Sequence, residues 1–294
     1  MEPFERFVDT PSGKIHLLDW GGVGYPAHFL HANGFCSGTY GPLFAHLTGS
    51  LRIMASDIRG HGDSIHPNTG RIRHWRIFAE DLKLLIDRAM QPPVIGIGHS
   101  LGAVATYIAA ARYRHLFSAV VLIDPPILPL KKIWMVRAAK LLGQSRRIPL
   151  ARMARRRRRV FKSRQEAFDR FSSGRGMFKT WSDEFIRAYL ECGLLEKDEQ
   201  QAVLKCDPEL EAQIFEAIPL DVWRYAGAIR CPVLALRGEH SETFTPEAAR
   251  RLSRFIDDYT LHTVPHSGHF IPMEKPESCA RLIVDFVLQK VGLI

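Results

Sequence analysis

With 294 residues, 46% of them hydrophobic, the chain is long enough for one large domain with a sizeable core, and this composition excludes a mainly disordered protein. No apolar stretch approaches the length that spans a bilayer, and the first residues lack the basic and apolar regions of a secretory signal. The net charge of +9 comes from one segment: residues 131–164 hold 14 of the 40 Lys and Arg and no Asp or Glu, which leaves 26 basic against 31 acidic residues elsewhere. This uneven distribution excludes a general nucleic-acid-binding surface.

The cysteines are scattered along the chain, odd in number and without C-x-x-C spacing. They are Cys36, Cys192, Cys206, Cys231 and Cys279. This pattern favours neither a disulfide framework nor a zinc site. We therefore expect reduced thiols in a cytoplasmic protein.

Strand-like apolar runs alternate with helix-like patterns along the first part of the chain. Strands are expected at residues 27–30, 51–56, 94–98 and 119–123, preceded by two antiparallel edge strands around residues 6–9 and 14–20. Helices are expected at residues 74–90 and 101–113. The prolines at positions 92 and 93 end the first of these helices.

The alternation returns near the C-terminus, with strands expected at residues 232–236 and 259–264 and helices at about 247–255 and 276–290. Such alternation implies a mostly parallel sheet with helices on both faces. Residues 125–228 break the pattern, because they hold several amphipathic stretches and no convincing strand. We therefore expect an α/β core of residues 1–124 and 229–294, interrupted by a helical insertion at residues 125–228.

The strongest chemical signal is Gly98–Gly102, which fits the pattern G-x-S-x-G between an apolar strand and a helix. The glycines are needed because the turn from strand to helix is tight and strains the backbone of the serine. The hydroxyl of Ser100 then projects from the carboxyl end of the sheet, where open α/β folds bind their ligands. We interpret Ser100 as a nucleophile.

Four motifs, in this order, resemble the α/β-hydrolase superfamily. They are His31–Gly34, Asp57–Ser64, the Gly98–Gly102 turn, and Gly268–Phe270 followed by Glu274 and Pro276. The resemblance covers residues 14 to about 125 and 231 to the end, and it is specific for the fold rather than for a substrate. It implies an α/β-hydrolase fold, with the insertion as a helical cap and the activity of a serine esterase or lipase.

The resemblance places the general base at His269. A serine hydroxyl is a poor nucleophile until a neighbouring base takes its proton, and an imidazole suits this transfer at neutral pH. Gly268 allows the loop to fold back over the serine turn. His266 in the same loop is the alternative base, and we interpret it as a loop residue.

Several carboxylates are candidates for the acid that should orient His269. In the superfamily this acid usually follows the strand before the histidine, at a position that Ser241 occupies here. Glu242, one residue later, is our first choice. Asp124, at the end of the strand after the serine turn, is the alternative acid, since some superfamily members carry their acid there, and Glu239 comes third. Asp124 would otherwise cap local backbone N–H groups.

Two backbone N–H groups are expected to form an oxyanion hole. Leu101, directly after the nucleophile, supplies one. The resemblance aligns Asn33 with the residue that supplies the other, and its side chain could add a further donor. Asn33 and Gly34 also fit an ordinary Asn-Gly turn. The Asp57–Gly60 segment resembles the structural turn of the superfamily and is interpreted as scaffold.

The predicted insertion contains large apolar residues, which we interpret mainly as its own core and in part as the lining of an acyl or aryl pocket. They include Trp134, Met135, Phe178, Trp181, Phe185, Tyr189, Phe215 and Trp223.

The insertion also holds five consecutive arginines: Arg155, Arg156, Arg157, Arg158 and Arg159. A solvated helix face is the simplest interpretation of this run. Attraction of anionic substrates and peripheral contact with an anionic membrane are the alternatives. A nucleic-acid partner is not expected, because the run lacks interleaved aromatic residues.

These residues predict hydrolysis of a small-molecule carboxylic ester through an acyl-enzyme intermediate, with no metal or organic cofactor. A lipase or lysophospholipase, a lactonase, a thioesterase and a C–C bond hydrolase are alternatives on the same scaffold. A non-catalytic binding protein that keeps the fold is an alternative of another class. The fold itself does not choose among them.

Overall fold

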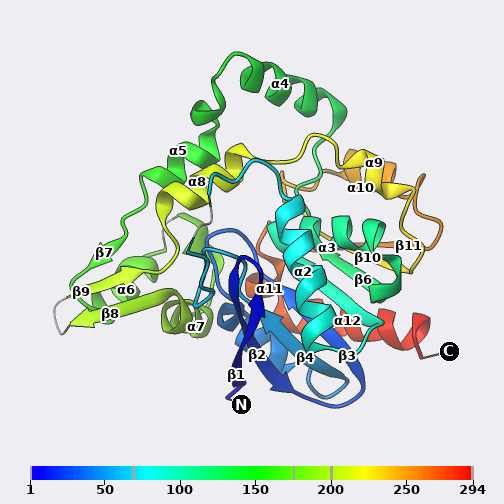
Figure 1. Ribbon diagram of the computed structural model, residues 1–294, viewed down its shortest axis with the longest axis horizontal. Helices are drawn as coiled ribbons and strands as arrows, with labels where there is room; N and C mark the ends of the chain where they lie inside the picture. The colour runs from blue at the N-terminus through cyan, green and yellow to red at the C-terminus, as the bar shows by residue number, and fades with distance from the viewer. Residues whose placement is uncertain (1, 68–69, 175, 199–200, 293–294) are drawn as a thin grey trace.

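The computed structural model describes residues 2–67, 70–174, 176–198 and 201–292 (Figure 1). Its main sheet has eight strands in the order β1-β2-β4-β3-β5-β6-β10-β11. Their bounds are β1 Phe4–Thr10, β2 Gly13–Gly21, β3 Tyr25–Leu30, β4 Leu51–Ser56, β5 Val94–His99, β6 Phe117–Ile123, β10 Val233–Gly238 and β11 Tyr259–Val264. The first two strands pair antiparallel and the other six are parallel to one another, so the predicted sheet is confirmed.

Helices cover both faces of this sheet (Figure 1). They are α1 Gly41–Ala45, α2 Arg76–Ala89, α3 Leu101–Arg112, α10 Pro246–Leu252, α11 Ile271–Glu274 and α12 Pro276–Lys290, with the short 3-10 helices η1 Ser37–Tyr40 and η2 Arg114–Leu116. Alternate side chains of a strand point to opposite faces. Ile95 and Ile97 accordingly pack in one hydrophobic cluster with α1 and α12, while Val120 and Leu122 pack in a second cluster with α2 and α3.

The register of the parallel strands brings several loops together at one edge. Leu30 lies opposite Gly98, and Ile123 lies opposite both His99 and Leu236. The carboxyl ends of β3, β5, β6 and β10 therefore meet at the same edge of the sheet. Residues that follow these strands become neighbours in space, although the chain separates them by up to about 200 positions.

The predicted insertion leaves the main sheet after β6 and contains helices, as expected, but also strands. The helices are α4 Leu130–Leu141, α5 Pro149–Arg155, α6 Arg164–Phe171, α7 Asp183–Gly193, α8 Pro208–Glu216 and α9 Trp223–Ala226, with η3 Ser145–Arg147 and η4 Gly176–Thr180. The strands β7 Val160–Phe161, β9 Gln201–Leu204 and β8 Leu194–Asp198 form a small antiparallel sheet in that order. The expectation of an insertion without strands is therefore wrong. These strands are two to five residues long, and β8 carries charged residues, so none of the three shows a long apolar run that would mark it as a strand.

The arginine run extends from the end of α5 to the residue before β7 and is bound by carboxylates of the insertion itself. Ion pairs with N–O distances of 2.5 to 2.9 Å join Arg155 to Glu209 and Glu216, Arg157 to Glu211, Arg158 to Glu166, and Arg159 to Asp207. Arg156 is exposed and makes no ion pair among the described residues. In the same part of the chain, no helix combines the length and the apolar character that crossing a membrane requires.

Cys36 and Cys192 form a disulfide, with their Cα atoms 6.3 Å apart. The bond joins the segment before η1 to α7 of the insertion. The expectation of reduced thiols is therefore wrong for these two residues. They are 156 positions apart, so no spacing pattern in the sequence could reveal the pair. The remaining cysteines, Cys206, Cys231 and Cys279, are free.

Candidate active site

The predicted serine turn lies between β5 and α3. Ser100 has a φ of 54° and a ψ of −115°, a backbone conformation that residues other than glycine rarely adopt. A Cβ atom at Gly98 would lie 2.4 Å from the backbone of Gly102, and one at Gly102 would lie 2.0 Å from the carbonyl oxygen of Leu30. Glycine is thus required at both positions, and the turn leaves Ser100 partly exposed at the carboxyl end of the sheet.

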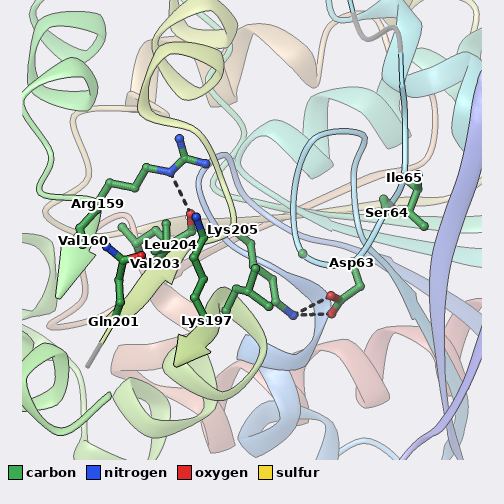
Figure 2. A pocket seen from close by; sticks show the side chains of 12 residues that line it. Asp63, Ser64, Ile65, Arg159, Val160, Lys197, Gln201, Val203, Leu204 and Lys205 are labelled. Carbon is green, nitrogen blue, oxygen red and sulfur yellow. Dashed lines mark hydrogen bonds and ion pairs between the residues drawn. The ribbon is translucent and has the colours of Figure 1, made fainter. Parts of the chain in front are cut away.

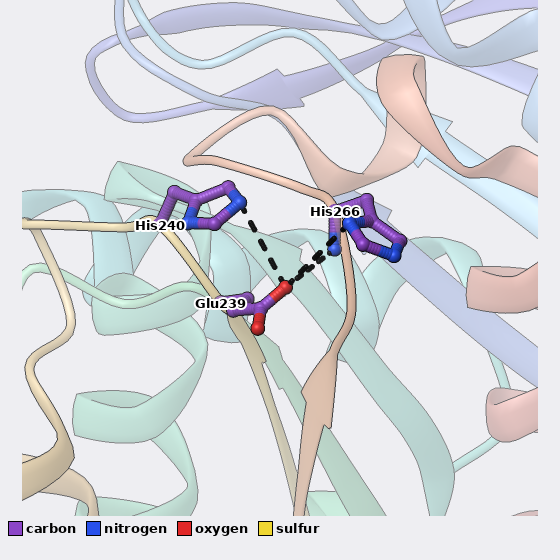
Figure 3. A group of neighbouring side chains, drawn as sticks. All are labelled: Glu239, His240 and His266. Atoms are coloured by element: carbon purple, nitrogen blue, oxygen red, sulfur yellow. Dashed lines mark hydrogen bonds and ion pairs between the residues drawn. The ribbon is translucent and has the colours of Figure 1, made fainter.

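The loop after β11 brings His269 to the serine. His269 Nε2 lies 2.9 Å from Ser100 Oγ, although 169 positions separate the two residues. His266, the alternative base, is exposed and has a φ of 52°. Its backbone N–H donates a hydrogen bond to the carboxylate of Glu239, which its ring also faces (Figure 3).

The carboxylate beside His269 belongs to Asp124. Its Oδ2 lies 2.7 Å from His269 Nδ1, so the ring is hydrogen bonded on both sides. Asp124 is fully buried and accepts two further hydrogen bonds, from the backbone N–H of Gly238 at 3.0 Å and from the hydroxyl of Ser241 at 2.5 Å. Its φ of 43°, which aspartate tolerates better than most residues, turns the side chain toward these partners.

Neither of the other carboxylates considered lies at this position. Glu242, our first choice from the sequence, is exposed and is not among the hydrogen-bond partners of His269 in the described residues. Glu239 is exposed and faces His266. The structure therefore replaces Glu242 by Asp124 as the partner of His269. The reason is the pairing of β6 with β10, which places Asp124 beside Gly238 and Ser241. Glu242, the residue after Ser241, is exposed to solvent instead.

His99, the variable residue before the serine, connects two loops of the site. Its Nε2 lies 2.9 Å from the backbone oxygen of His269, and its Nδ1 lies 2.8 Å from the hydroxyl of Tyr40, which accepts the backbone N–H of Ala32. Burial lowers the pKa of His99 well below its usual value, so the ring is neutral. In the tautomer that fits these contacts, Nε2–H donates to His269 and Nδ1 accepts from Tyr40. The sequence pattern leaves this position open, so it gave no signal for this role.

One candidate oxyanion donor, Leu101, lies within the serine turn, and the other, Asn33, lies in the loop after β3. Leu101 begins α3, where the first backbone N–H groups have no acceptor within the helix. Among the described residues, neither its amide nor that of Asn33 makes a hydrogen bond. The side chain of Asn33 is occupied, because Nδ2 donates to the backbone oxygen of Glu211 and Oδ1 faces His61. Its backbone amide therefore remains available, whereas its side chain is not.

Asp57 holds the turn after β4 that was interpreted as scaffold. Its Oδ1 accepts hydrogen bonds from the backbone N–H and the hydroxyl of Ser37, and its Oδ2 lies 2.6 Å from His16 Nδ1. Burial alone would raise the pKa of Asp57. The hydrogen bond to His16, the nearby imidazoles and the backbone N–H of Ser37 outweigh burial and hold this pKa well below its usual range. These contacts are those of a structural residue.

Aromatic rings of the insertion meet rings of the core beside the serine turn. The ring of Trp181 lies 5.3 Å from that of Phe35 and 5.7 Å from that of Phe270, and the ring of Tyr189 lies 5.7 Å from that of Phe35. Phe270 in turn contacts the ring of His269 at 5.1 Å. Of the other apolar insertion residues predicted to form a core or a pocket, Phe178 and Phe185 are buried, Phe215 and Trp223 are partly buried, and Trp134 and Met135 are exposed.

A cavity of about 510 Å³ lies away from these residues, between the segment 62–65 of the core and the small sheet of the insertion (Figure 2). Its lining includes three cations, Arg159, Lys197 and Lys205. Lys205 is paired with Asp63 at 2.6 Å, and Arg159 is paired with Asp207. Neither Ser100 nor His269 lines this cavity.

The fold and this arrangement of groups define a hydrolase of the α/β class. Residues 29–282 match the model of the alpha/beta hydrolase family, and the chain therefore belongs to this family.

The proteins to which this chain is similar include a named hydrolase and a thioesterase domain. The 2-(acetamidomethylene)succinate hydrolase of Mesorhizobium japonicum is 27% identical over 260 residues, which cover 88% of this chain and 86% of the relative. The solved structure of E-2-(acetamidomethylene)succinate hydrolase has a TM-score of 0.78 at 26% identity and covers 97% of this chain and 99% of its own. A thioesterase domain from the curacin biosynthetic pathway, with a TM-score of 0.74 at 16% identity over 97% of this chain and 100% of its own, shares the fold.

Proposed function

We propose that the protein hydrolyses carboxylic esters, with Ser100 as nucleophile, His269 as general base and Asp124 as the acid that orients it. The observation that carries this proposal is the chain of hydrogen bonds from Asp124 through His269 to Ser100, with lengths of 2.7 and 2.9 Å. Such a chain makes a serine reactive, because the imidazole can take the hydroxyl proton while the oxygen attacks.

The reaction needs only these side chains and water. Ser100 Oγ attacks the ester carbonyl while His269 Nε2 takes its proton, and Asp124 stabilises the resulting imidazolium at Nδ1. His269 then gives the proton to the leaving alcohol, and the acyl group stays on Ser100. A water molecule attacks the acyl carbon as His269 takes one of its protons. The carboxylic acid leaves, and the proton returns to Ser100.

We further propose that the free backbone amides of Leu101 and Asn33 bind the oxygen that becomes negative during each attack. Donors fixed before the reaction stabilise this charge without reorganising, and one such donor typically contributes about 3 kcal/mol to the transition state. The hydrogen bond from Asn33 Nδ2 to the backbone oxygen of Glu211 fixes the turn that carries one of them.

The predicted insertion, residues 125–228, is proposed to act as a cap. Its residues Trp181 and Tyr189 pack against Phe35, and Trp181 also packs against Phe270 next to His269. These rings supply an apolar wall beside the nucleophile. Such a wall suits an acyl or aryl portion of the substrate.

Hydrolysis of an amide is the second candidate. The 2-(acetamidomethylene)succinate hydrolase of Mesorhizobium japonicum covers most of this chain, and the solved structure of an E-2-(acetamidomethylene)succinate hydrolase has a TM-score of 0.78. The same three side chains would cleave a C–N bond if His269 delivered its proton to the leaving nitrogen. A panel of esters, thioesters, lactones, lipids, lysophospholipids, C–C substrates and N-acetyl enamines compares these alternatives by kcat/KM.

The first test compares wild type with Ser100→Ala on short-chain p-nitrophenyl esters. Loss of the nucleophile should lower the rate by roughly 10⁴-fold or more. Ser253→Ala is the matched control, because Ser253 is an exposed serine at the end of α10. Equal rates for wild type and Ser100→Ala would refute the proposal and favour a binding protein without catalysis.

Contact with an anionic membrane through Arg155–Arg159 stays a prediction. It has little support, because ion pairs within the chain already neutralise four of these five charges. A small-molecule substrate remains the expected partner.

A further inference from the structure

Glu239, His240 and His266 gather at the carboxyl ends of β10 and β11 (Figure 3). Glu239 and His240 directly follow β10, and His266 follows β11 by two residues. Their side chains are 45%, 69% and 84% exposed, respectively. The proposed hydrolysis uses none of the three.

The three side chains present their donor atoms to a common point. One atom of each lies within 4.8 Å of the other two. Glu239 Oε2 is 3.7 Å from His240 Nε2 and 4.0 Å from His266 Nδ1. Around a tetrahedral zinc ion with bonds near 2.0–2.1 Å, neighbouring donors are about 3.4 Å apart. The two distances from Glu239 exceed this spacing by about 0.3 and 0.6 Å, and rotation of the exposed histidine side chains would bring all three donors to it.

Two imidazoles and one carboxylate are a donor set that zinc and similar ions prefer. The exposure of the group leaves a further position for water. A second group of suitable residue types, Glu5, His16 and Asp63, differs in this respect. His16 is buried, so an ion there would have less room for water.

This group is connected through the backbone to the candidate active site. The residue before Glu239 is Gly238, whose N–H binds Asp124. The backbone N–H of His240 donates to the oxygen of Ser267, two residues before His269. The two loops touch closely, since a Cβ at Gly238 would lie 1.9 Å from the backbone oxygen of Gly268.

We propose that Glu239, His240 and His266 bind one divalent transition-metal ion such as Zn²⁺, which bridges the loops after β10 and β11 and slows the hydrolysis. The effect on the rate rests on the proposed function, whereas the binding does not. The ion draws the two histidines toward Glu239 and shifts the loop of His269. Small displacements of a catalytic group have large effects on rate.

Calorimetric titration of the untagged, metal-free full chain with Zn²⁺ tests the binding. Wild type is expected to bind one equivalent, and His240→Ala/His266→Ala should bind it about tenfold more weakly or worse, since even residues outside the ligand sphere change metal affinity by that factor. His262→Ala is the matched control, because His262 is exposed on β11 outside the group. Equal affinity in wild type and the double variant, or no binding by wild type, would overturn the site.

The same titration of Ser100→Ala separates this proposal from the hydrolase proposal. It should bind Zn²⁺ like wild type, whether or not the protein cleaves esters. For the rate, saturating Zn²⁺ should slow hydrolysis of p-nitrophenyl acetate about tenfold in wild type but not in the double variant. Equal inhibition of both proteins would place the inhibiting ion elsewhere and overturn the link to activity. Thermal unfolding of each variant verifies that it is folded, and His240→Gln alone gives the same comparison if the double variant is not.

Discussion

Asp124 and Glu242 lie in contrasting surroundings. Asp124 is fully buried, and its two oxygens meet the ring of His269, the hydroxyl of Ser241 and the backbone N–H of Gly238. Glu242 lies in solvent. A carboxylate can hold an imidazole in one tautomer and stabilise its charge only from within hydrogen-bonding distance. The geometry therefore supports Asp124 in this role.

Asp124→Asn should lower kcat for ester hydrolysis by roughly 10⁴-fold, because the amide favours the wrong tautomer of His269 while keeping its position. Glu242→Gln, the matched control, should leave kcat and KM within about twofold of wild type. Stopped-flow or steady-state assays of the two variants give the comparison. A larger loss in Glu242→Gln than in Asp124→Asn would contradict the assignment.

The sequence indicated part of this site because part of it is local. Ser100 lies in a turn where only glycine fits beside the backbone at two positions, and His269 lies in a glycine-containing loop that follows a strand. The choice between Asp124 and Glu242 depends instead on how β6 pairs with β10, which are more than 100 positions apart. His99 was missed for a similar reason, since its role comes from contacts with Tyr40 and the loop of His269.

Helix α8 of the insertion is bonded both to the insertion and to the loop after β3 of the core. The carboxylate of Glu211 binds Arg157 at 2.9 Å, and its backbone oxygen accepts the side chain of Asn33. The side chains of Arg157 and Glu211 are only 13% and 10% exposed. The guanidinium also bonds to the hydroxyl of Tyr189. Removing one member of such a pair leaves a buried charge without compensation.

Arg157→Met should therefore lower the free energy of unfolding by about 3–5 kcal/mol. Arg156→Met is the matched control, since Arg156 is the exposed neighbour without an ion pair among the described residues, and its effect should stay within about 0.5 kcal/mol. Urea denaturation at neutral pH measures both. Similar small effects in the two variants would show that the buried ion pair does not stabilise the insertion.

The Cys36–Cys192 disulfide predicts how many thiols react, and this prediction can be tested without an enzyme assay. Unfolded protein kept oxidised should expose three free thiols to a thiol reagent, namely those of Cys206, Cys231 and Cys279. After reduction all five cysteines should react. The count rises by two because the sulfur atoms of the disulfide react with the reagent only after reduction.

Cys192→Ser provides the control for this count. It should release Cys36 and expose four free thiols without any reductant, whereas Cys231→Ser should expose two. Five reactive thiols in unreduced wild type would refute the bond. Disulfides persist in oxidising compartments, so a confirmed bond would also argue against the cytoplasmic location expected from the cysteine pattern.

Elements were predictable where burial and chain geometry act over a few residues. The strands β4 and β11 and the helix α12 have the bounds that their apolar patterns predict. The strands β8 and β9 were missed, because they are short and form through the pairing of β9 with β8 and β7, which the sequence pattern does not reveal. The parallel sheet was predictable as a whole because its strands alternate with helices.

Buried histidines make the stability of the whole molecule sensitive to acid. Burial lowers the pKa of His28 to about 3 and that of His61 to about 3, and it lowers the pKa of His99 well below its usual value. In the unfolded chain each of these rings titrates near pH 6.5. Between this pH and the lower folded-state pKa the unfolded chain binds more protons, so stability falls as the pH falls.

The free energy of unfolding should accordingly be lower at pH 5 than at pH 7, with a slope of up to about 1.4 kcal/mol per pH unit for each of the three histidines. Urea denaturation at pH 7, 6 and 5 measures it. His16 offsets only part of this loss. Burial would lower its pKa, but Asp57 raises it above the usual value, so His16 adds stability as the pH falls from 7 through about 6.5 and adds nothing further once it is charged in both states. Equal stability at pH 5 and pH 7 would contradict the prediction.

The hydroxyl of Ser241 and the carboxylate of Asp124 share one small niche between two neighbouring strand ends. An exchange of the two residues, Asp124→Ser with Ser241→Asp, would keep one acid and one hydroxyl within reach of His269. During evolution an acid could therefore migrate from one strand end to the other through an ancestor that briefly carried both. The position of a carboxylate in the sequence is then a poor guide to which residue serves as the acid of His269, whereas the space between the two strand ends stays the same.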